Sequence, residues 1–307
     1  MCGRRYFYAA IMLIFVMLAA SCGSGAHDGS AQGQGTAQGQ GAAQGQGAAQ
    51  GQDAQEISVS GDGIDGELTF TLPELKAMQD AVFEHVYSTI NNWPAAKFYA
   101  ARGIRVATVL KAAGVLETAK LITFRSNDSY EVTLTRRQLL EDEQFYFPSV
   151  ESGSGEGAEK VEPILAYEFK EGSSDMAKTM PEEFCLIIGQ RNYAEHTNPA
   201  FVENIKEIVV SAAPPEKWQQ AGIFPVSGRV SAGDSIKLQH PEFGLVKLFY
   251  TVDGSDPTEM SAMYNPSTYQ PELNKPIVFN ESAVLKVLVT GYGREDSDIA
   301  VFNIEVL

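Results

Sequence analysis

The chain has 307 residues and a formal net charge of −16, with 23 basic and 39 acidic side chains. This length leaves room for about two domains. The acidity opposes contact with phosphate backbones and with anionic lipid headgroups, so we expect no nucleic-acid partner and no purely electrostatic membrane attachment. Removing residues 1–21, which carry two arginines and no acidic residue, would take the charge from −16 to −18.

The amino terminus has the pattern of a secretory signal over residues 1–21. Arg4 and Arg5 precede an apolar run at residues 9–18, and small residues then lead up to Cys22. A transmembrane helix is the competing interpretation, but the apolar run is shorter than the ~20 residues that a bilayer requires. We therefore expect this segment to be removed during secretion.

The residues Ala19-Ala20-Ser21-Cys22 resemble the lipobox of bacterial lipoproteins, with Ala19 where leucine is usual. The resemblance implies cleavage before Cys22 and a diacylglycerol on its thiol, which would hold the secreted protein on the outer face of a bacterial membrane. Two acyl chains suffice for stable anchoring. Arg4-Arg5-Tyr6-Phe7 also resembles a twin-arginine export signal, and an ordinary positively charged leader explains the same residues, so the export route stays open.

Residues 22–56 are predicted to be a lipid anchor followed by a flexible linker. A six-residue unit of alanine, glutamine and glycine repeats over residues 31–54. Such a segment has too little apolar surface to offset the entropy of ordering. A Gly-rich coil from residue 23 to residue 56 would span roughly 30 Å, and we expect it to be disordered.

Residues 57–213 alternate between strand and helix patterns, which predicts an α+β domain. Strands are predicted at 57–59, 68–71, 121–124, 130–134, 184–188 and 208–210. A first helix is predicted to begin at Thr71 and to continue along an apolar face at Leu75, Met78 and Val82. A second helix is predicted over residues 106–113, ending at Gly114, and a third begins at residues 135–140.

Several segments of this region together resemble the molybdopterin-binding oxidoreductase domain of the sulfite oxidase family. They are the stretch around Asn91, then 101–104 with 109–114, 127–130, 186–190 and 201–208. The resemblance implies a molybdopterin cofactor whose metal is held by a cysteine shortly before the asparagine. No cysteine occurs between residues 23 and 184. The hydroxyl of Ser88 is a poorer ligand for a soft metal, and Cys185 has the apolar neighbours of a buried, inert thiol.

We therefore expect no metal site, no catalytic residues and no cofactor in this domain, with a pterin- and molybdenum-dependent oxidoreductase as the alternative. What the resemblance leaves is a cleft for a small polar or anionic ligand. Its candidate wall residues are Tyr87, Ser88, Asn91, Asn92, Tyr99 and Arg102. A structural role explains the same residues: a turn at Asn91-Asn92, tyrosines in the core, and an ion pair at Arg102.

Residues 214–224 begin with Pro214-Pro215 and are predicted to be a linker to a second domain at 225–307. Six short strand patterns follow, at 228–230, 235–238, 247–252, 277–279, 283–289 and 299–304, which predicts a small β-sandwich. Residues 250–258, with Ser261, Tyr264 and 296–297, resemble the C-terminal domain of chitobiase and β-hexosaminidase. That resemblance implies an accessory immunoglobulin-like domain without catalytic residues. Asp253, Asp256 and Glu259 form a weak candidate calcium site.

The sequence thus predicts an α+β chain: a sulfite-oxidase-like mixed domain, then an immunoglobulin-like β-sandwich, behind a disordered linker. It contains no zinc-ligand spacing, nucleophile elbow or phosphate-binding loop. We expect a lipid-anchored cell-surface protein that binds a ligand or partner without catalysis. If it is an enzyme, we expect a molybdopterin-type oxidoreductase. A further alternative is attachment to cell-wall carbohydrate through residues 225–307.

Overall fold

The computed structural model describes residues 55–91, 95–265 and 276–307. Nineteen strands and two α-helices lie in these residues, so the described chain is rich in β-structure. The predictions for the signal segment, Cys22, the linker up to residue 54 and Asn92 fall outside the described residues.

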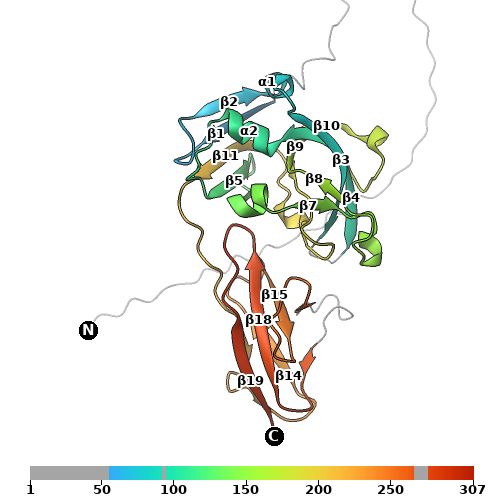
Figure 1. The fold of residues 1–307 in the computed structure, drawn as a ribbon, viewed down its shortest axis with the longest axis vertical. Coiled ribbons are helices and arrows are strands. Elements are labelled where there is room, and N and C mark those ends of the chain that lie inside the picture. The colour runs from blue at the N-terminus through green and yellow to red at the C-terminus, as the bar shows by residue number, and fades with distance from the viewer. Residues whose placement is uncertain (1–54, 92–94, 266–275) are drawn as a thin grey trace, which may run out of the picture. The chain divides into compact units, whose positions relative to one another are not determined.

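Two sheets dominate the first half of the described chain (Figure 1). The first has the order β2-β1-β11-β5-β6, formed by Leu68–Thr71, Glu56–Ser60, Ile205–Ser211, Leu121–Ser126 and Glu131–Thr135. The second has the order β10-β9-β4-β3, formed by Met180–Ile187, Ile164–Glu171, Ala96–Arg105 and Val82–Ile90. A two-stranded ribbon joins β7 (Gln144–Tyr146) to β8 (Glu159–Val161). Strands β1 and β11 are parallel, and the other pairs in these sheets are antiparallel.

Both sheets contribute to one hydrophobic core. Ile57, Phe124 and Ile208 come from the first sheet, whereas Ile104 and Phe184 come from the second, and all are fully buried. Burial of such side chains contributes about 1.5–3 kcal/mol each. The strands predicted from residues 57, 68, 121, 130, 184 and 208 are all present, and β3, β4 and β9 are additional strands that the sequence analysis did not predict.

Helix α1 (Leu72–Ala77) begins where the sequence predicts and ends earlier. Thr71 caps it, since the Thr71 hydroxyl accepts from the backbone of Glu74 while the Glu74 carboxylate accepts from the Thr71 backbone. The helix stops before Met78, and Val82 opens strand β3 instead of continuing the helical face. The spacing of apolar residues in 75–82 therefore predicted too long a helix, because Val82 belongs to the alternating pattern of the next strand.

Helix α2 (Val106–Ala112) matches its prediction, and Gly114 follows with a φ of +70°. The third predicted helix is a single π-helical turn at Arg137–Glu141. Three further short turns of 3₁₀-helix lie at Val150–Ser152, Met176–Lys178 and Asn198–Ala200.

The second half of the described chain holds two more sheets. One has the order β12-β14-β17, formed by Gly222–Phe224, Ser235–Gln239 and Ile277–Val278. The other has the order β13-β19-β18-β15-β16, formed by Arg229–Val230, Ala300–Val306, Ala283–Gly291, Val246–Thr251 and Ala262–Met263. All six predicted strands are present, and β12 and β16 are additional.

These two sheets share a second hydrophobic core, separate from the first, as in a β-sandwich. Ile236 and Leu238 come from the smaller sheet, while Leu248 and Leu285 come from the larger one. Trp218, Ala221 and Ile223 also belong to this core, although the sequence analysis assigns 214–224 to a linker. The carboxyl-terminal part of that segment is therefore packed into the sandwich.

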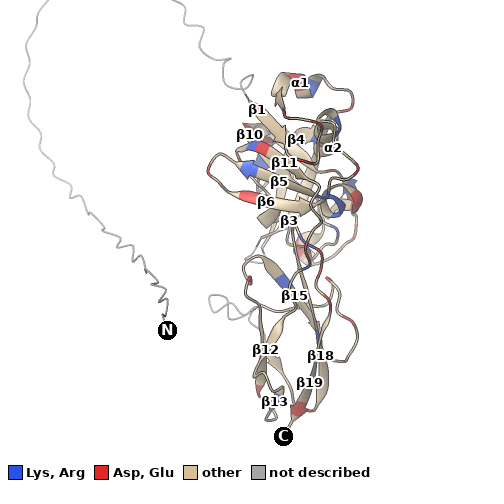
Figure 2. Cartoon of the chain, turned by 90° about the vertical axis from the view of Figure 1, so that its left-hand side faces the viewer, with Lys and Arg blue, Asp and Glu red and all other residues tan. Residues whose placement is uncertain are grey.

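Basic and acidic residues both occur along the strands (Figure 2). On the first sheet, Arg125 of β5 pairs with Glu131 of β6 at 2.8 Å and with Glu207 of β11 at 3.2 Å. Such exposed pairs contribute little to stability, about 0–1 kcal/mol each. Among the described residues, no helix has the length and apolarity needed to cross a bilayer.

Candidate functional site

Ser88 lies in the stretch that the sequence analysis compares with the metal-ligand segment of the sulfite oxidase family, and its hydroxyl is hydrogen-bonded within the protein. Ser88 lies on β3 and is fully buried, with 0% exposure. Its Oγ donates to Oε1 of Gln190 at 2.5 Å and accepts from the backbone N–H of Phe147 at 2.8 Å. The Gln190 amide in turn donates to the backbone oxygen of Glu195 at 2.8 Å. Ser88 is therefore part of a closed buried network.

This donor set does not fit a molybdenum centre. A serine ligand would have to lose its proton, and with it the hydrogen bond to Gln190, in a fully buried position. Cys185, the one thiol in the described residues, is buried in β10 with its Sγ 3.5 Å from the Leu186 carbonyl, and burial raises its pKa well above the usual range. Across the residues that the structure describes, no group of three or more histidine, cysteine or acidic side chains could hold a metal ion.

The other predicted cleft residues do not gather around one cavity. Tyr87 is buried and donates to the Glu162 carbonyl at 2.6 Å. Arg102 pairs with Glu84 at 2.7 Å and with Glu168 at 2.9 Å, so its guanidinium is engaged by two carboxylates. Asn91 accepts from the backbone N–H of Ala95 at 3.0 Å, as in a turn. Each of these three side chains thus has a partner within the protein.

Among the predicted cleft residues that the structure describes, Tyr99 lines a cavity. That cavity has a volume of about 340 Å³ and includes the carboxylates of Asp128, Glu171 and Glu203. The Tyr99 hydroxyl accepts from the Asn198 amide at 3.3 Å, and burial and the nearby Glu171 raise its pKa. Lys97 offsets the charge of Glu171, whereas the hydrogen bond from Ser126 leaves Asp128 its charge, so this hollow is acidic.

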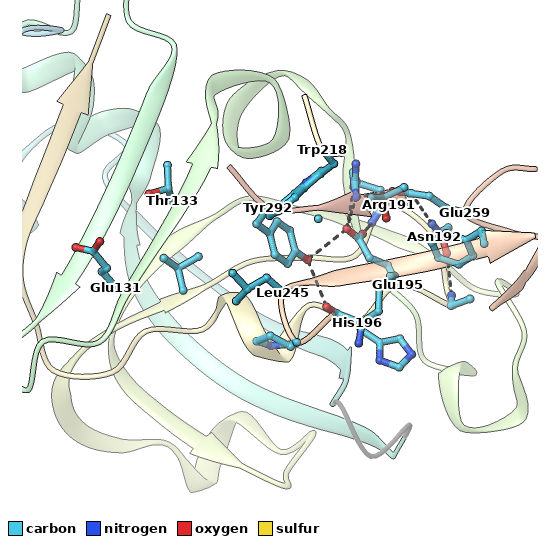
Figure 3. A pocket seen from close by; sticks show the side chains of 18 of the residues that line it. Glu131, Thr133, Arg191, Asn192, Glu195, His196, Trp218, Leu245, Glu259 and Tyr292 are labelled. Atoms are coloured by element: carbon cyan, nitrogen blue, oxygen red, sulfur yellow. Dashed lines mark hydrogen bonds and ion pairs between the residues drawn. The ribbon is translucent and has the colours of Figure 1, made fainter. Parts of the chain in front are cut away.

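A second cavity, which we call the junction cavity, is the stronger candidate (Figure 3). It has a volume of about 330 Å³, within the range of small-ligand sites. Residues from both halves of the described chain line it. Tyr130 to Thr133 come from β6 and its approach, 191–196 from the segment after β10, and Trp218, Phe249 and Tyr292 from the region of the second core.

A buried ion cluster forms one wall of the junction cavity. The Arg191 guanidinium lies 2.6 Å from a Glu195 carboxylate oxygen, 2.9 Å from Glu259 and 3.5 Å from Asp142. Asn192 adds a hydrogen bond of 3.3 Å to Glu259. Burial alone would lower the pKa of Arg191, but the attraction of Glu195 and Glu259 outweighs it and raises that pKa. Arg191 therefore stays charged and offsets part of the negative charge of the three carboxylates around it.

The turn after β18 forms part of this wall through Gly291 and Tyr292. Tyr292 packs against the first hydrophobic core, and its hydroxyl lies 3.4 Å from Oε1 of Glu195 and 3.5 Å from the His196 carbonyl. The Gln138 side chain donates to the Gly291 carbonyl at 2.9 Å and accepts from the Gly293 N–H at 3.0 Å. Gly293 has a φ of +76°, and a Cβ there would lie 2.8 Å from the Thr133 carbonyl oxygen. The turn is thus held by specific contacts from both halves of the chain.

Two basic side chains of the junction cavity have lowered pKa values. Burial, followed by the charge of Lys247, lowers the pKa of His196 from 6.5 to about 4. Burial also lowers the pKa of Lys247 and raises that of Glu259. Burial therefore disfavours the charged forms of these three groups, whereas Arg191 keeps its charge.

The three carboxylates of the weak calcium candidate have separate partners. Asp253 accepts from the Ser255 backbone at 3.0 Å, Asp256 pairs with Lys286 at 2.7 Å, and Glu259 pairs with Arg191 at 2.9 Å. They do not converge on one position.

A family model matches part of the second half of the chain. Residues 236–304 match the family model described as Fn3 associated. No curated protein matches the sequence.

Among solved structures, the chain is similar to the sulfane dehydrogenase SoxCD from Paracoccus pantotrophus. The sequences are 10% identical, the TM-score is 0.35, and the likeness covers 85% of this chain and 80% of that one. A likeness at this TM-score carries no weight for fold or activity.

Sequence analysis missed the junction cavity because its residues are scattered over the chain. Arg191, His196 and Trp218 carry no recognisable motif, and the importance of Tyr292 follows only from its contact with the first core. One signal was present in the sequence. Trp218 lies in a predicted linker, where a large aromatic side chain is out of place unless it is packed.

Proposed function

We propose that this protein is a lipid-anchored cell-surface protein that binds a ligand without catalysis. In this proposal residues 57–213 have a sulfite-oxidase-like fold that has lost its metal chemistry, and residues 225–307 are an immunoglobulin-like accessory module. Cys22 carries the diacylglycerol, and residues 23–56 give the folded part its distance from the membrane.

The observation that carries the proposal is the closed network around Ser88. A catalytic metal site needs a ligand atom with a free lone pair and an open coordination position. The Ser88 hydroxyl is fully buried, donates its proton to Gln190 and accepts from the Phe147 N–H, so metal binding would require loss of that proton and of the hydrogen bond to Gln190 inside a packed core. The buried thiol of Cys185 is no substitute.

The junction cavity is the proposed binding site. Its volume suits a small molecule, and its walls combine aromatic side chains with a few buried polar groups, which is the usual make-up of a ligand site. The ion cluster of Arg191 holds one wall in place without leaving a carboxylate free to act as a base.

Metal analysis of the protein purified from its native host tests the absence of catalysis. We expect molybdenum well below one atom per chain, and no pterin fluorescence after oxidative extraction. Stoichiometric molybdenum would support the oxidoreductase instead.

A second candidate function is attachment to cell-wall carbohydrate through the β-sandwich, of which residues 236–304 match an Fn3-associated family model. Sedimentation of the full chain with purified cell wall or chitin tests it. Recovery of the protein in the supernatant at every wall concentration would rule out this role and would leave the proposed ligand binding untouched.

A further inference from the structure

Strand β6 forms one edge of the first sheet, and it lines the junction cavity. The sheet order ends at β6, and Glu131 and Thr133 of this strand are among the lining residues. In Figure 3 these two residues lie opposite Leu245 and Tyr292. An edge strand carries a row of backbone N–H and C=O groups that no neighbouring strand satisfies. The pairing of β6 with β5 decides which of its backbone groups these are.

Hydrogen bonds at both ends of the β5–β6 pair fix the direction of the β6 backbone groups. The Ser126 N–H donates to the Tyr130 carbonyl at 2.9 Å, and the Arg136 N–H donates to the Lys120 carbonyl at 2.8 Å. Bonded and non-bonded positions alternate along an antiparallel pair, and the register between these ends has no shift. The even-numbered residues of β6 therefore bond to β5, and the odd-numbered ones point their backbone groups away from it.

The odd-numbered residues of β6 are Glu131, Thr133 and Thr135. The Thr135 N–H donates to the Gln138 side chain at 3.0 Å, as this direction requires. The Thr133 carbonyl faces the turn after β18, since a Cβ on Gly293 would lie 2.8 Å from its oxygen. Within the described residues, the Glu131 N–H, the Glu131 carbonyl and the Thr133 N–H make no hydrogen bond. This edge thus offers two donors and one acceptor to a partner.

The other long edges of the two sheets of the first half are protected, whereas β6 is not. On β3, Arg105 donates to the Val82 carbonyl at 2.9 Å and the His85 ring donates to the Val86 carbonyl at 2.8 Å. Strand β10 contains Pro181 and a shift in its register, and β2 has four residues. Strand β6 has no proline, no lysine and no shift in register. Proline, lysine, irregular register and short length are the usual ways of keeping another chain off an edge.

The remaining surface of the cavity can hold side chains of an added strand. Leu245 lines the cavity and is 68% exposed, so its apolar surface is available. Phe249 also lines it and belongs to neither hydrophobic core. Side chains of an extended chain alternate between two sides, so every second side chain of a strand beside β6 would face one wall.

The charges of the cavity are slightly unbalanced. Three acidic side chains line it, Glu131, Glu195 and Glu259, together with two basic ones, Arg191 and Lys247. A partner with a basic side chain complements this excess better than an acidic partner does.

The ligand class of this cavity, which rests on the proposed binding function, follows from the open edge. We propose that β6 binds a short extended peptide segment of a second protein by strand addition. Two carbonyl groups of the peptide accept from the N–H groups of Glu131 and Thr133, and one peptide N–H donates to the Glu131 carbonyl. In this mode the main-chain bonds supply affinity, and the walls select among side chains.

Hydrogen exchange of single amides tests the proposed bonds in the wild type. Peptides are selected on the full folded chain from a phage-displayed library of random seven-residue sequences, and the most enriched one is synthesised with blocked ends. Exchange is followed by NMR with and without this peptide. We expect the amides of Glu131 and Thr133 to exchange at least about tenfold more slowly in the complex. The amides of Val132 and Leu134, which already bond to β5, should change little.

Two proline variants provide a matched pair. Glu131→Pro removes an N–H that points away from β5, so the sheet keeps its bonds and peptide affinity should fall at least about tenfold. Thr69→Pro makes the same change on the opposite edge strand, β2. The Leu72 N–H bonds to the Gln55 carbonyl at 2.9 Å, which by the same alternation points the exposed Thr69 N–H away from β1. This variant is expected to bind the peptide as the wild type does, and circular dichroism shows whether each variant is folded.

Three results would overturn the proposal. One is a library without any enriched peptide, and another is protection confined to amides outside β6. The third is protection of Glu131 and Thr133 without peptide, together with a concentration-dependent dimer in sedimentation, because a second copy of the chain would then cover this edge. Each of these leaves the proposed absence of catalysis standing, since molybdenum content tests that separately.

Discussion

At the residue scale, Ser88 is a buried polar side chain with a structural role. Its hydroxyl contributes to structure through Gln190 and Phe147. Ser88→Ala would leave a buried amide oxygen and a buried N–H without a partner. We expect the free energy of unfolding to fall by about 1–3 kcal/mol in urea denaturation.

The matched control for this prediction is Ser152→Ala. Ser152 is exposed and bonds only to the neighbouring Ser149 carbonyl, so its replacement should change stability by less than about 0.5 kcal/mol. Equal effects of the two substitutions would contradict the structural role of Ser88.

His196 makes a prediction about pH. Its pKa is about 4 in the folded protein and 6.5 without the fold, so between these values the unfolded chain binds a proton that the folded chain does not. Stability contributed by neutral His196 is then complete above pH 6.5 and is lost as the pH falls toward 4, by at most about 3 kcal/mol.

Urea titrations of the wild type and of His196→Gln at several pH values between 4 and 7 measure this effect. The difference between the two proteins isolates the histidine from the acidic groups that titrate nearby. We expect the wild type to lose its advantage steadily below pH 6.5. A difference that does not depend on pH would show that His196 is accessible to protons in the folded state.

At the residue scale the sequence analysis predicted the buried nature of Cys185. It offered a cleft and a structural role as two interpretations of Tyr87, Asn91 and Arg102. Two partners of these side chains, Glu162 for Tyr87 and Glu168 for Arg102, lie more than sixty residues away in the chain. A single sequence contains no signal for such contacts, whereas capping at Thr71 is local and was predictable.

At the scale of elements, the turn after β18 packs closely against Thr133 of β6. Gly293 in this turn has a φ of +76°, and a Cβ there would lie 2.8 Å from the Thr133 carbonyl oxygen. Gly293→Ala therefore adds both backbone strain and a clash with a carbonyl oxygen. We expect it to destabilise the protein by roughly 1–3 kcal/mol more than strain alone.

Gly233→Ala is the control for strain alone. Gly233 has a φ of +86°, and a Cβ there meets nothing within 4 Å. If thermal unfolding shows the same loss for both variants, the contact between the turn and Thr133 does not stabilise the protein.

The ion cluster of the segment after β10 gives a further prediction. Arg191→Gln would leave Glu195 and Glu259 buried without their cation. Breaking a buried pair by removing one partner costs about 3–5 kcal/mol. Chemical denaturation should show a loss of that size, and Arg229→Gln, which removes the exposed pair with Glu305, should cost less than about 1 kcal/mol.

Helices and strands were predicted correctly where an alternating apolar pattern or a capping residue lies within the element itself. They were missed or mispredicted where contacts with distant residues determine the structure. Strand β3 contains the buried polar side chains Ser88 and Thr89, which break the apolar alternation that identifies a strand. The third predicted helix shrank to a π-turn, where Gln138 is bonded both to Thr135 and to the turn after β18.

At the scale of the whole molecule, the proposed anchor predicts where the protein resides. Cys22→Ala would remove the thiol that accepts the lipid. We expect the variant to leave the detergent phase in Triton X-114 partition and to lose palmitate labelling, whereas Cys2→Ala should behave as the wild type. An unlabelled wild type would contradict lipidation.

The division of the described chain into two hydrophobic cores follows from the sequence pattern, since strand-rich residues after 227 differ from the mixed pattern before 213. The junction cavity does not follow from it, because its walls exist only when both halves contribute their side chains. Its proposed ligand and the proposed absence of a metal are independent claims about two places in the fold.

Native mass spectrometry of the detergent-solubilised protein from its own host tests the central claim most directly. We predict a polypeptide that begins at a diacylated Cys22 and carries no mass attributable to a molybdenum–pterin group; a peptide adduct is compatible with this result. A tightly held adduct that releases molybdenum and a pterin on unfolding would contradict the claim that this domain binds without oxidising.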